Sequence, residues 1–90
     1  MASIRIPTPL RAYTDGESAI SVDGSTVGEA LENLVSQHPD LKPHLFNDDE
    51  LRSFVNIFLD DEDIRFLQGL ETEIADNDSL RIIPSIAGGR

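Results

Sequence analysis

The chain has 90 residues, enough for one domain with a single modest core. Seventeen acidic residues against seven basic ones give a net charge of -10, which repels nucleic acid and anionic membrane surfaces and favours a partner with a basic face. The absence of cysteine excludes disulfides, thiolate metal sites and a catalytic cysteine.

The first residues, "MASIRIPTPL", lack the basic and then apolar pattern of a signal peptide. The longest apolar runs are only a few residues, too short to span a membrane. We therefore expect a soluble, cytoplasmic protein without nucleic-acid or membrane partners.

Apolar residues alternate in two short segments near the N-terminus. Ile4 and Ile6 point one way in "SIRIP", and Ile20 and Val22 share a face of "SAISV". The turn signal "TDGE" at 14–17 lies between them. These segments predict an antiparallel hairpin with a rather long loop.

The period then changes to that of an amphipathic helix. The apolar stripe at i, i+3, i+4, i+7 and i+8 consists of Val27, Ala30, Leu31, Leu34 and Val35. Thr26 with Glu29 three residues later predicts a capping box, in which each side chain satisfies an amide donor at the helix start. Pro39 is expected to close the helix.

The second half of the chain predicts further strands. Residues 41–50 are irregular, but Leu41, Leu45 and Phe46 are expected to fill one end of the core. "RSFVNIFLDDEDIRFL" indicates a strand, an acidic turn at 60–63 and a short return strand. A last strand is expected from Leu80 to Ile83.

The order of these elements is strand, strand, helix, strand, short strand, strand. An α+β fold with one helix packed on one face of a mixed sheet of four to five strands is the simplest way to bury the helical stripe. This is the β-grasp, or ubiquitin-like, arrangement. We expect it to occupy residues 1–84, with a flexible tail at 85–90.

The tail, "SIAGGR", follows Pro84, which ends the last strand because proline cannot donate to a sheet ladder. It is either a frayed end without consequence or a thin reactive arm. Gly88 and Gly89 have no Cβ, so the backbone can enter a narrow channel and bring a terminal carboxylate to a reactive centre. An acyl-adenylate made there with ATP could be attacked by a sulfur nucleophile or an amine.

Three segments carry a resemblance to a known family: "SIRIPTPLRAYT" (3–14), "STVGEALENL" (25–34) and "FVNIFLDDEDIRFLQGLETEIADNDSLRIIPSIAGG" (54–89). The chain closely resembles the ubiquitin-like sulfur carriers of the ThiS/MoaD superfamily. These include the small subunit of molybdopterin synthase, the thiamine sulfur carrier and the sulfur carrier of an alternative cysteine pathway. The third segment is most similar to the cysteine-pathway carrier.

The resemblance implies that Gly89 carries the reactive carboxylate and that Gly88 is its slim neighbour. A ubiquitin-activating-enzyme-like adenylyltransferase and sulfurtransferase would consume ATP to convert this carboxylate into a thiocarboxylate. A biosynthetic enzyme, cysteine-synthase-like or other, would accept the sulfur. The chain would then be a protein co-substrate without a bound cofactor, and not an enzyme.

Arg90 departs from the family pattern, because carriers that are ready for use end at the second glycine. Its peptide bond turns the carboxylate of Gly89 into an amide, which cannot be adenylated. We expect a protease, by analogy a zinc-dependent JAMM-type peptidase, to remove Arg90. Alternatively, Arg90 is a remnant or a natural dead end.

An apolar patch is expected to meet the partners. Phe58 and Ile83 fall on the strand faces opposite to the core, while Ile86 and Ala87 in the tail are further candidates for partner contact. Alternatively, the loops at 41–46 and 66–70 cover the strand residues.

No metal site is predicted. The acidic runs at 47–50 and 60–63 lack the alternating ligands and central glycine of a calcium loop, and His38 and His44 have no third ligand at a telling spacing. Other functions remain open: a protein modifier joined to lysines through Gly89, a molybdopterin synthase small subunit, or a β-grasp binding module with an inert tail.

Overall fold

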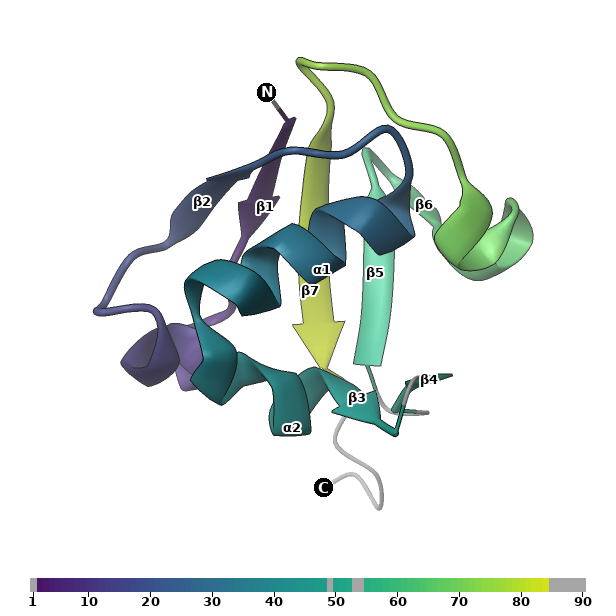
Figure 1. Ribbon diagram of the computed structural model, residues 1–90. Coiled ribbons are helices and arrows are strands. Elements are labelled where there is room, and N and C mark those ends of the chain that lie inside the picture. Colours follow the sequence, from purple (N-terminus) through teal and green to yellow (C-terminus); the bar gives the residue numbers. More distant parts are fainter. Residues whose placement is uncertain (1, 49, 53–54, 85–90) are drawn as a thin grey trace.

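The computed structural model describes residues 2–48, 50–52 and 55–84 (Figure 1). Its strands are β1 (Ala2–Arg5), β2 (Ala19–Val22), β3 (Phe46–Asn47), β4 (Glu50–Leu51), β5 (Val55–Leu59), β6 (Glu62–Asp63) and β7 (Ser79–Pro84). Its α-helices are α1 (Val27–Gln37) and α2 (Lys42–Leu45), and its 3-10 helices are η1 (Thr8–Tyr13), η2 (Pro39–Leu41), η3 (Ile64–Phe66) and η4 (Gly69–Glu71). Within the described residues no helix is long and apolar enough to cross a membrane.

A mixed sheet has the strand order β2-β1-β7-β5-β6. β1 pairs antiparallel with β2 and parallel with β7, and β7 pairs antiparallel with β5. The register places Ile4 between Ile20 on β2 and Leu80 on β7, so the apolar residues of three strands share one face. The predicted N-terminal hairpin and mixed sheet are confirmed.

Helix α1 crosses the apolar face of the sheet (Figure 1). Four residues of its predicted stripe are fully buried, namely Val27, Ala30, Leu31 and Leu34. Val35 is partly buried and packs against the core. Each leucine or valine buried in this way contributes about 1.5–3 kcal/mol relative to an exposed position. Burial of this stripe against the sheet completes the predicted β-grasp fold.

The connection after α1 closes one end of the core. Leu41 and Leu45 are buried and Phe46 packs against them, as predicted. The segment is more regular than its sequence indicated, because α2 leads into a small hairpin of β3 and β4. Asp48 takes a left-handed backbone conformation at the turn of this hairpin, with φ 60°.

The expected acidic turn at 60–63 was partly wrong. The turn consists of Asp60 and Asp61, while Glu62 and Asp63 form the return strand β6. Asp60 has a φ of 56°, and this left-handed residue permits a reversal so tight that pairing resumes at once, between Leu59 and Glu62.

One of the two hydrogen bonds of the predicted capping box at the start of α1 is confirmed, and the other has a different partner. The Thr26 hydroxyl accepts a hydrogen bond from the amide of Glu29 at 3.2 Å, as expected. The Glu29 carboxylate, however, accepts from the amide and hydroxyl of Ser25, at 2.8 and 3.0 Å, instead of from Thr26. An isolated bridge between Thr26 and Glu73 holds the chain extended here and leaves Ser25 facing the carboxylate.

We expect this cap to make stability depend on pH. The backbone hydrogen bond from Ser25, followed by that of its hydroxyl, holds the pKa of Glu29 below its usual value of 4.5. The stabilisation is therefore fully present above 4.5 and is lost as the pH falls through the lowered value. In urea unfolding at pH 7 and pH 3, Glu29→Gln should destabilise the protein more at pH 7 than at pH 3. Equal losses at both pH values for Glu29→Gln would contradict this.

Candidate functional site

The predicted reactive residues Gly88 and Gly89, together with Arg90, lie outside the described residues, as do Ile86 and Ala87. The structure does describe the point from which the tail departs. Pro84, the last residue of β7, is the register partner of Val55 at the start of β5. Because β7 is held between β1 and β5, the tail is joined to a central strand of the sheet.

The predicted partner residues Phe58 and Ile83 lie together on the sheet face opposite to α1. Their neighbours along the strands, Ile57 and Ile82, are buried on the helix side, so alternation directs Phe58 and Ile83 outward. Ile83 is 38% exposed, and Phe58 is half-buried. We call this surface, with Arg5, Asn56 and Arg81, the open sheet face.

The loops at 41–46 and 66–70, which were considered as covers for Phe58 and Ile83, place their apolar side chains elsewhere. Leu41 and Leu45 belong to the core on the helix side, and Phe66 in the second loop is 84% exposed. The placement of Phe58 and Ile83 thus agrees with an accessible apolar patch, and their contact with a partner stays a prediction.

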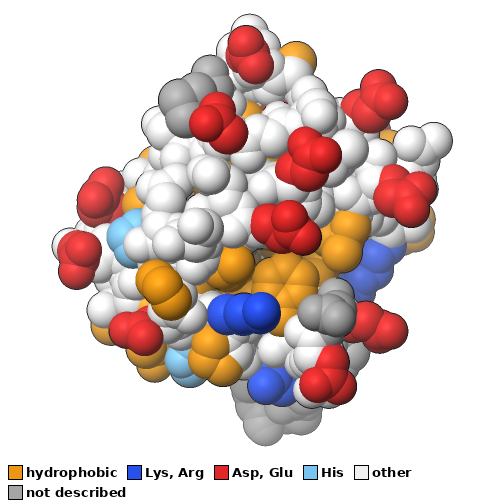
Figure 2. All heavy atoms as spheres, in the orientation of Figure 1, with side chains coloured by type: hydrophobic (Ala, Val, Ile, Leu, Met, Phe, Trp, Pro, Cys, Tyr) orange, Lys and Arg blue, Asp and Glu red, His pale blue; other side chains and the backbone are white. Residues whose placement is uncertain are grey.

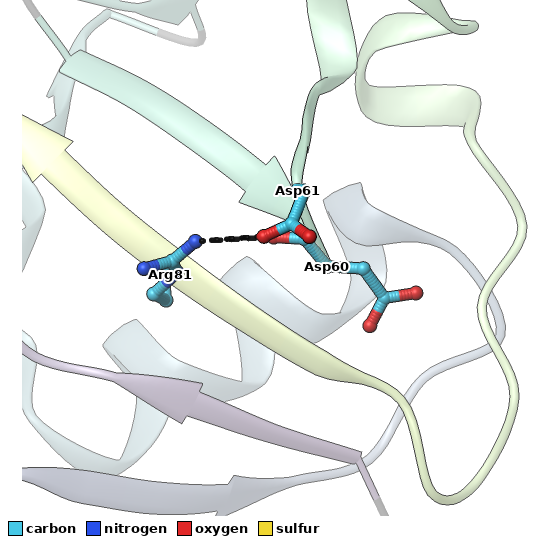
Figure 3. A network of polar contacts seen from close by, with 3 residues as sticks. All are labelled: Asp60, Asp61 and Arg81. Atoms are coloured by element: carbon cyan, nitrogen blue, oxygen red, sulfur yellow. Dashed lines mark hydrogen bonds and ion pairs between the residues drawn. The ribbon is translucent and has the colours of Figure 1, made fainter.

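Two arginines stand side by side in the open sheet face. Arg5 on β1 and Arg81 on β7 are register partners, and Phe58 is opposite Arg81 on its other side. Arg81 is 3.5 Å from the Asp61 carboxylate and donates to the Asp60 carbonyl at 3.3 Å (Figure 3). Both side chains of this ion pair are exposed, so it contributes little stability and leaves Arg81 available to a partner.

A shallow hollow of about 600 Å³ lies at the end of the molecule where β7 finishes. It is lined by Pro39, Lys42, Pro43, Phe46, Asn47, Asp48 and Arg52. The Arg52 carbonyl accepts from the Val55 amide at 3.0 Å, which connects this hollow to the base of the tail. Figure 2, drawn from the α1 side, shows acidic side chains scattered over the surface and basic ones in its lower half, toward this end.

The histidines have structural positions. His38 is the C-cap of α1, and its amide donates to the Leu34 carbonyl at 2.9 Å. His44 stacks on Tyr13 with ring centroids 4.3 Å apart. Among the described residues no group of three or more His, Cys, Asp or Glu side chains could hold a metal ion.

The sequence interpretation missed one exposed apolar feature. Phe66 and Leu67 are 84% and 38% exposed at the end of η3, beside a groove of about 280 Å³ over Leu51, Ile64 and Leu70. The return strand predicted after the turn at 60–63 is wrong for residues 64–67, because Ile64–Phe66 form the 3-10 helix η3. No periodicity in the sequence separates an exposed phenylalanine on a short 3-10 helix from a buried one.

Comparison with known proteins assigns the fold and adds information on the tail. Residues 4–89 match the ThiS family, and this matched region contains both Gly88 and Gly89. The sulfur carrier protein CysO of Mycobacterium tuberculosis is 40% identical over 90 residues, covering 97% of each chain. A chain in the crystal structure of the Amycolatopsis orientalis BexX/CysO complex matches with a TM-score of 0.91 and 40% identity, covering 99% of this chain and 100% of that one. Small archaeal modifier protein 1 of Haloferax volcanii is 38% identical over 72 residues, covering 78% of each.

Proposed function

The chain belongs to the ThiS family, and from this premise we propose that it carries sulfur as a thiocarboxylate on Gly89. Its likeness to a sulfur carrier over nearly its whole length, with the Gly-Gly pair inside the matched region, is the observation that supports the proposal most strongly. The carrier is a protein co-substrate, and its partner enzymes supply the catalytic groups.

The chemistry begins with the Gly89 carboxylate, which is a poor electrophile. An adenylyltransferase resembling ubiquitin-activating enzymes joins it to the AMP part of ATP and releases pyrophosphate. Sulfide then attacks the carbonyl carbon, the bond from that carbon to AMP breaks, AMP leaves, and the thiocarboxylate remains. The carrier needs no bound cofactor, since ATP is bound and consumed by the activating enzyme.

The acceptor in this proposal is a biosynthetic enzyme that takes the thiocarboxylate sulfur, with a cysteine-synthase-like enzyme as the first candidate. Likeness to CysO, more than any feature of the described fold, supports cysteine formation as the pathway. We propose that all these steps occur in the cytoplasm.

The open sheet face is the proposed docking surface for the activating enzyme. Phe58 and Ile83 supply apolar contact area, and Arg81 between strands β1 and β5 supplies charge. Ile86 and Ala87 would follow into the partner's channel ahead of Gly88. A partner held on this face can receive the tail, since β7 belongs to the face and leads directly into the tail.

Loss of the apolar contact should weaken activation without changing the reactive group. We expect Ile83→Asp to raise the KM for loading by about 10-fold or more, because a charge would enter the centre of the interface. Phe58→Ala should act in the same direction. The measurement is ATP–pyrophosphate exchange against carrier concentration, with circular dichroism to check the fold.

Phe66→Ala is the matched control, because Phe66 is exposed on η3 outside the open sheet face. An unchanged KM for Ile83→Asp, or an equal rise for Phe66→Ala, would exclude this docking surface. If Phe58→Ala unfolds the protein, Phe58 belongs to the core and Ile83→Asp decides alone.

A protein modifier is the second candidate, favoured by the likeness to small archaeal modifier protein 1. The two functions share the adenylate and differ in the nucleophile that follows it. Blots of cell extract for the tagged chain separate them, since a modifier gives a ladder of lysine-linked conjugates. A molybdopterin synthase small subunit would instead co-purify with a large subunit.

The experiment for the proposed function compares the chain ending at Gly89 with one ending at Ala87, each with ATP, sulfide and a ThiS-family activating enzyme. Only the first should gain sulfur, as read from the intact mass. If the chain ending at Ala87 keeps the function of the full chain in cells, the protein is instead a binding module with an inert tail.

A further inference from the structure

The sequence contains two pairs in which glycine directly follows aspartate, Asp15–Gly16 and Asp23–Gly24. In such a pair the main-chain nitrogen of glycine can attack the side-chain carboxyl carbon of aspartate, because glycine has no Cβ to obstruct the approach. All four residues are exposed, so water reaches both pairs. The two pairs differ in the hydrogen bonding of the glycine amide.

The amide of Gly16 is held by the fold. Its N–H donates to the Arg11 carbonyl at 2.8 Å, in a turn that the buried Thr14 closes by donating from its hydroxyl to the Glu17 carbonyl at 2.9 Å. Asp15 takes a left-handed backbone conformation in this turn, with φ 56°. The Gly16 nitrogen cannot turn toward a carboxyl group and lose its proton while this hydrogen bond holds it, so the turn must open before any reaction.

The amide of Gly24 is not held in this way. Asp23 and Gly24 lie in the connection between β2 and α1 (Figure 1), and within the described residues the Gly24 N–H makes no hydrogen bond. In the same part of the chain the Asp23 carboxylate makes no hydrogen bond or ion pair. The Asp23 amide donates to Asn33 Oδ1 at 3.2 Å, which anchors the backbone at this residue. The two reacting groups can therefore meet without the loss of a hydrogen bond within the protein.

We propose that Asp23–Gly24 is a site of spontaneous isomerisation of aspartate to isoaspartate, with water as the only co-reactant. The Gly24 nitrogen attacks Cγ of the protonated Asp23 carboxyl group and a bond between nitrogen and Cγ forms. One water leaves, made of the carboxyl hydroxyl and the proton of the nitrogen, and a succinimide remains.

Water then opens the succinimide. When it adds to the main-chain carbonyl carbon of Asp23, the bond from that carbon to the Gly24 nitrogen breaks and this carbon becomes the free carboxylate. The main chain now runs through Cγ and is longer by one methylene group. When water adds at Cγ instead, the bond between nitrogen and Cγ breaks and aspartate is restored.

The fold has no slack for the longer main chain. Gly24 lies against the first turn of α1, where a Cβ on it would be 2.7 Å from the Ala30 amide nitrogen. On one side of the pair Val22 is fully buried at the end of β2, and on the other the Ser25 carbonyl accepts from the Ile74 amide at 3.0 Å. The isoaspartate form should therefore lose packing in front of α1 and unfold at a lower urea concentration.

The test follows the full chain at neutral pH over several weeks. Peptide mapping with electron-transfer fragmentation locates isoaspartate, and an isoaspartate-directed carboxyl methyltransferase with labelled S-adenosylmethionine measures its amount. In the folded protein, isoaspartate should form about 5-fold faster at Asp23 than at Asp15, the ratio expected when one backbone hydrogen bond has to break. The isoaspartate form, separated by ion-exchange chromatography, should have a lower urea midpoint than the unmodified chain.

Unfolding supplies the matched control, because the hydrogen bond of Gly16 is absent in guanidinium chloride. Isoaspartate should then form at Asp15 and Asp23 at similar rates. Asp23→Glu should abolish the signal at position 23, since attack on the longer side chain needs a larger ring that forms more slowly. Asp15→Glu should leave that signal unchanged.

Several results would overturn the proposal. These are equal rates at the two aspartates in the folded protein, faster reaction at Asp15, the same ratio of rates in guanidinium chloride, or no isoaspartate at Asp23 in the folded protein. A methyltransferase signal that persists in Asp23→Glu would place the reaction elsewhere and overturn it too. An unchanged urea midpoint for the isoaspartate form would show that the connection before α1 does have room for the longer main chain.

Discussion

The chain ending in Arg90 is expected to form no acyl-adenylate, whereas the chain ending at Gly89 forms one readily. The cause is covalent: with Arg90 attached, the carbonyl carbon of Gly89 belongs to an amide and lacks the carboxylate oxygen that attacks ATP. ATP–pyrophosphate exchange with an activating enzyme measures the difference directly. We expect a complete loss of exchange for the longer chain.

Arg90→Ala separates the amide from the charge of arginine. This variant should be as inactive as the parent, because its Gly89 is still amidated. Exchange at the rate of the chain ending at Gly89 would show that the arginine side chain, and not the peptide bond, causes the block.

Cell extract should convert the chain by removing one arginine, and a zinc chelator should stop the conversion if the peptidase is of the proposed zinc-dependent type. Sulfur loading in the extract without any loss of the arginine mass would contradict the expectation that Arg90 is removed before the chain is used.

Gly24→Ala is expected to destabilise the fold by about 2–4 kcal/mol. Gly24 has a φ of 148°, and a Cβ there would lie 2.7 Å from the Ala30 amide nitrogen and 2.9 Å from the Glu29 carbonyl carbon. These atoms belong to the first turn of α1, which is fixed by the buried stripe and cannot move aside cheaply. Urea unfolding followed by circular dichroism measures the loss.

Gly16→Ala is the matched control for the backbone term. Gly16 also has a positive φ, 83°, but a Cβ there meets nothing within 4 Å. It should therefore cost about 1 kcal/mol from conformation alone. Equal losses at the two positions would mean that the clash with α1 is relieved, and the account of Gly24 would be wrong.

The sequence predicted the fold where periodicity and burial agree. The i, i+3, i+4 stripe of α1 and the alternation of Ile4, Ile20 and Val22 each admit one core-facing side, so the helix, the hairpin and the sheet follow from them. The outward placement of Phe58 and Ile83 follows from the same alternation, since burial of Ile57 and Ile82 directs their neighbours to the other face.

Tertiary contacts decided the features that sequence reasoning missed. Glu29 bonds to Ser25 because the pairing of Thr26 with Glu73, which are 47 residues apart, sets the backbone before α1. The early reversal at Asp60 and the turn at Asp48 depend on left-handed aspartates, and aspartate adopts that conformation only in some contexts. Phe66 is likewise exposed on the 3-10 helix η3, which follows directly after β6.

The central claim is that sulfur binds to the main-chain terminus, so the most direct measurement follows the mass of that terminus. The chain ending at Gly89 is incubated with ATP, sulfide and each of several ThiS-family activating enzymes, and its C-terminal peptide is then analysed by mass spectrometry. The account predicts one terminal oxygen of Gly89 replaced by sulfur, dependent on ATP. An unchanged terminus with every enzyme tested would contradict it.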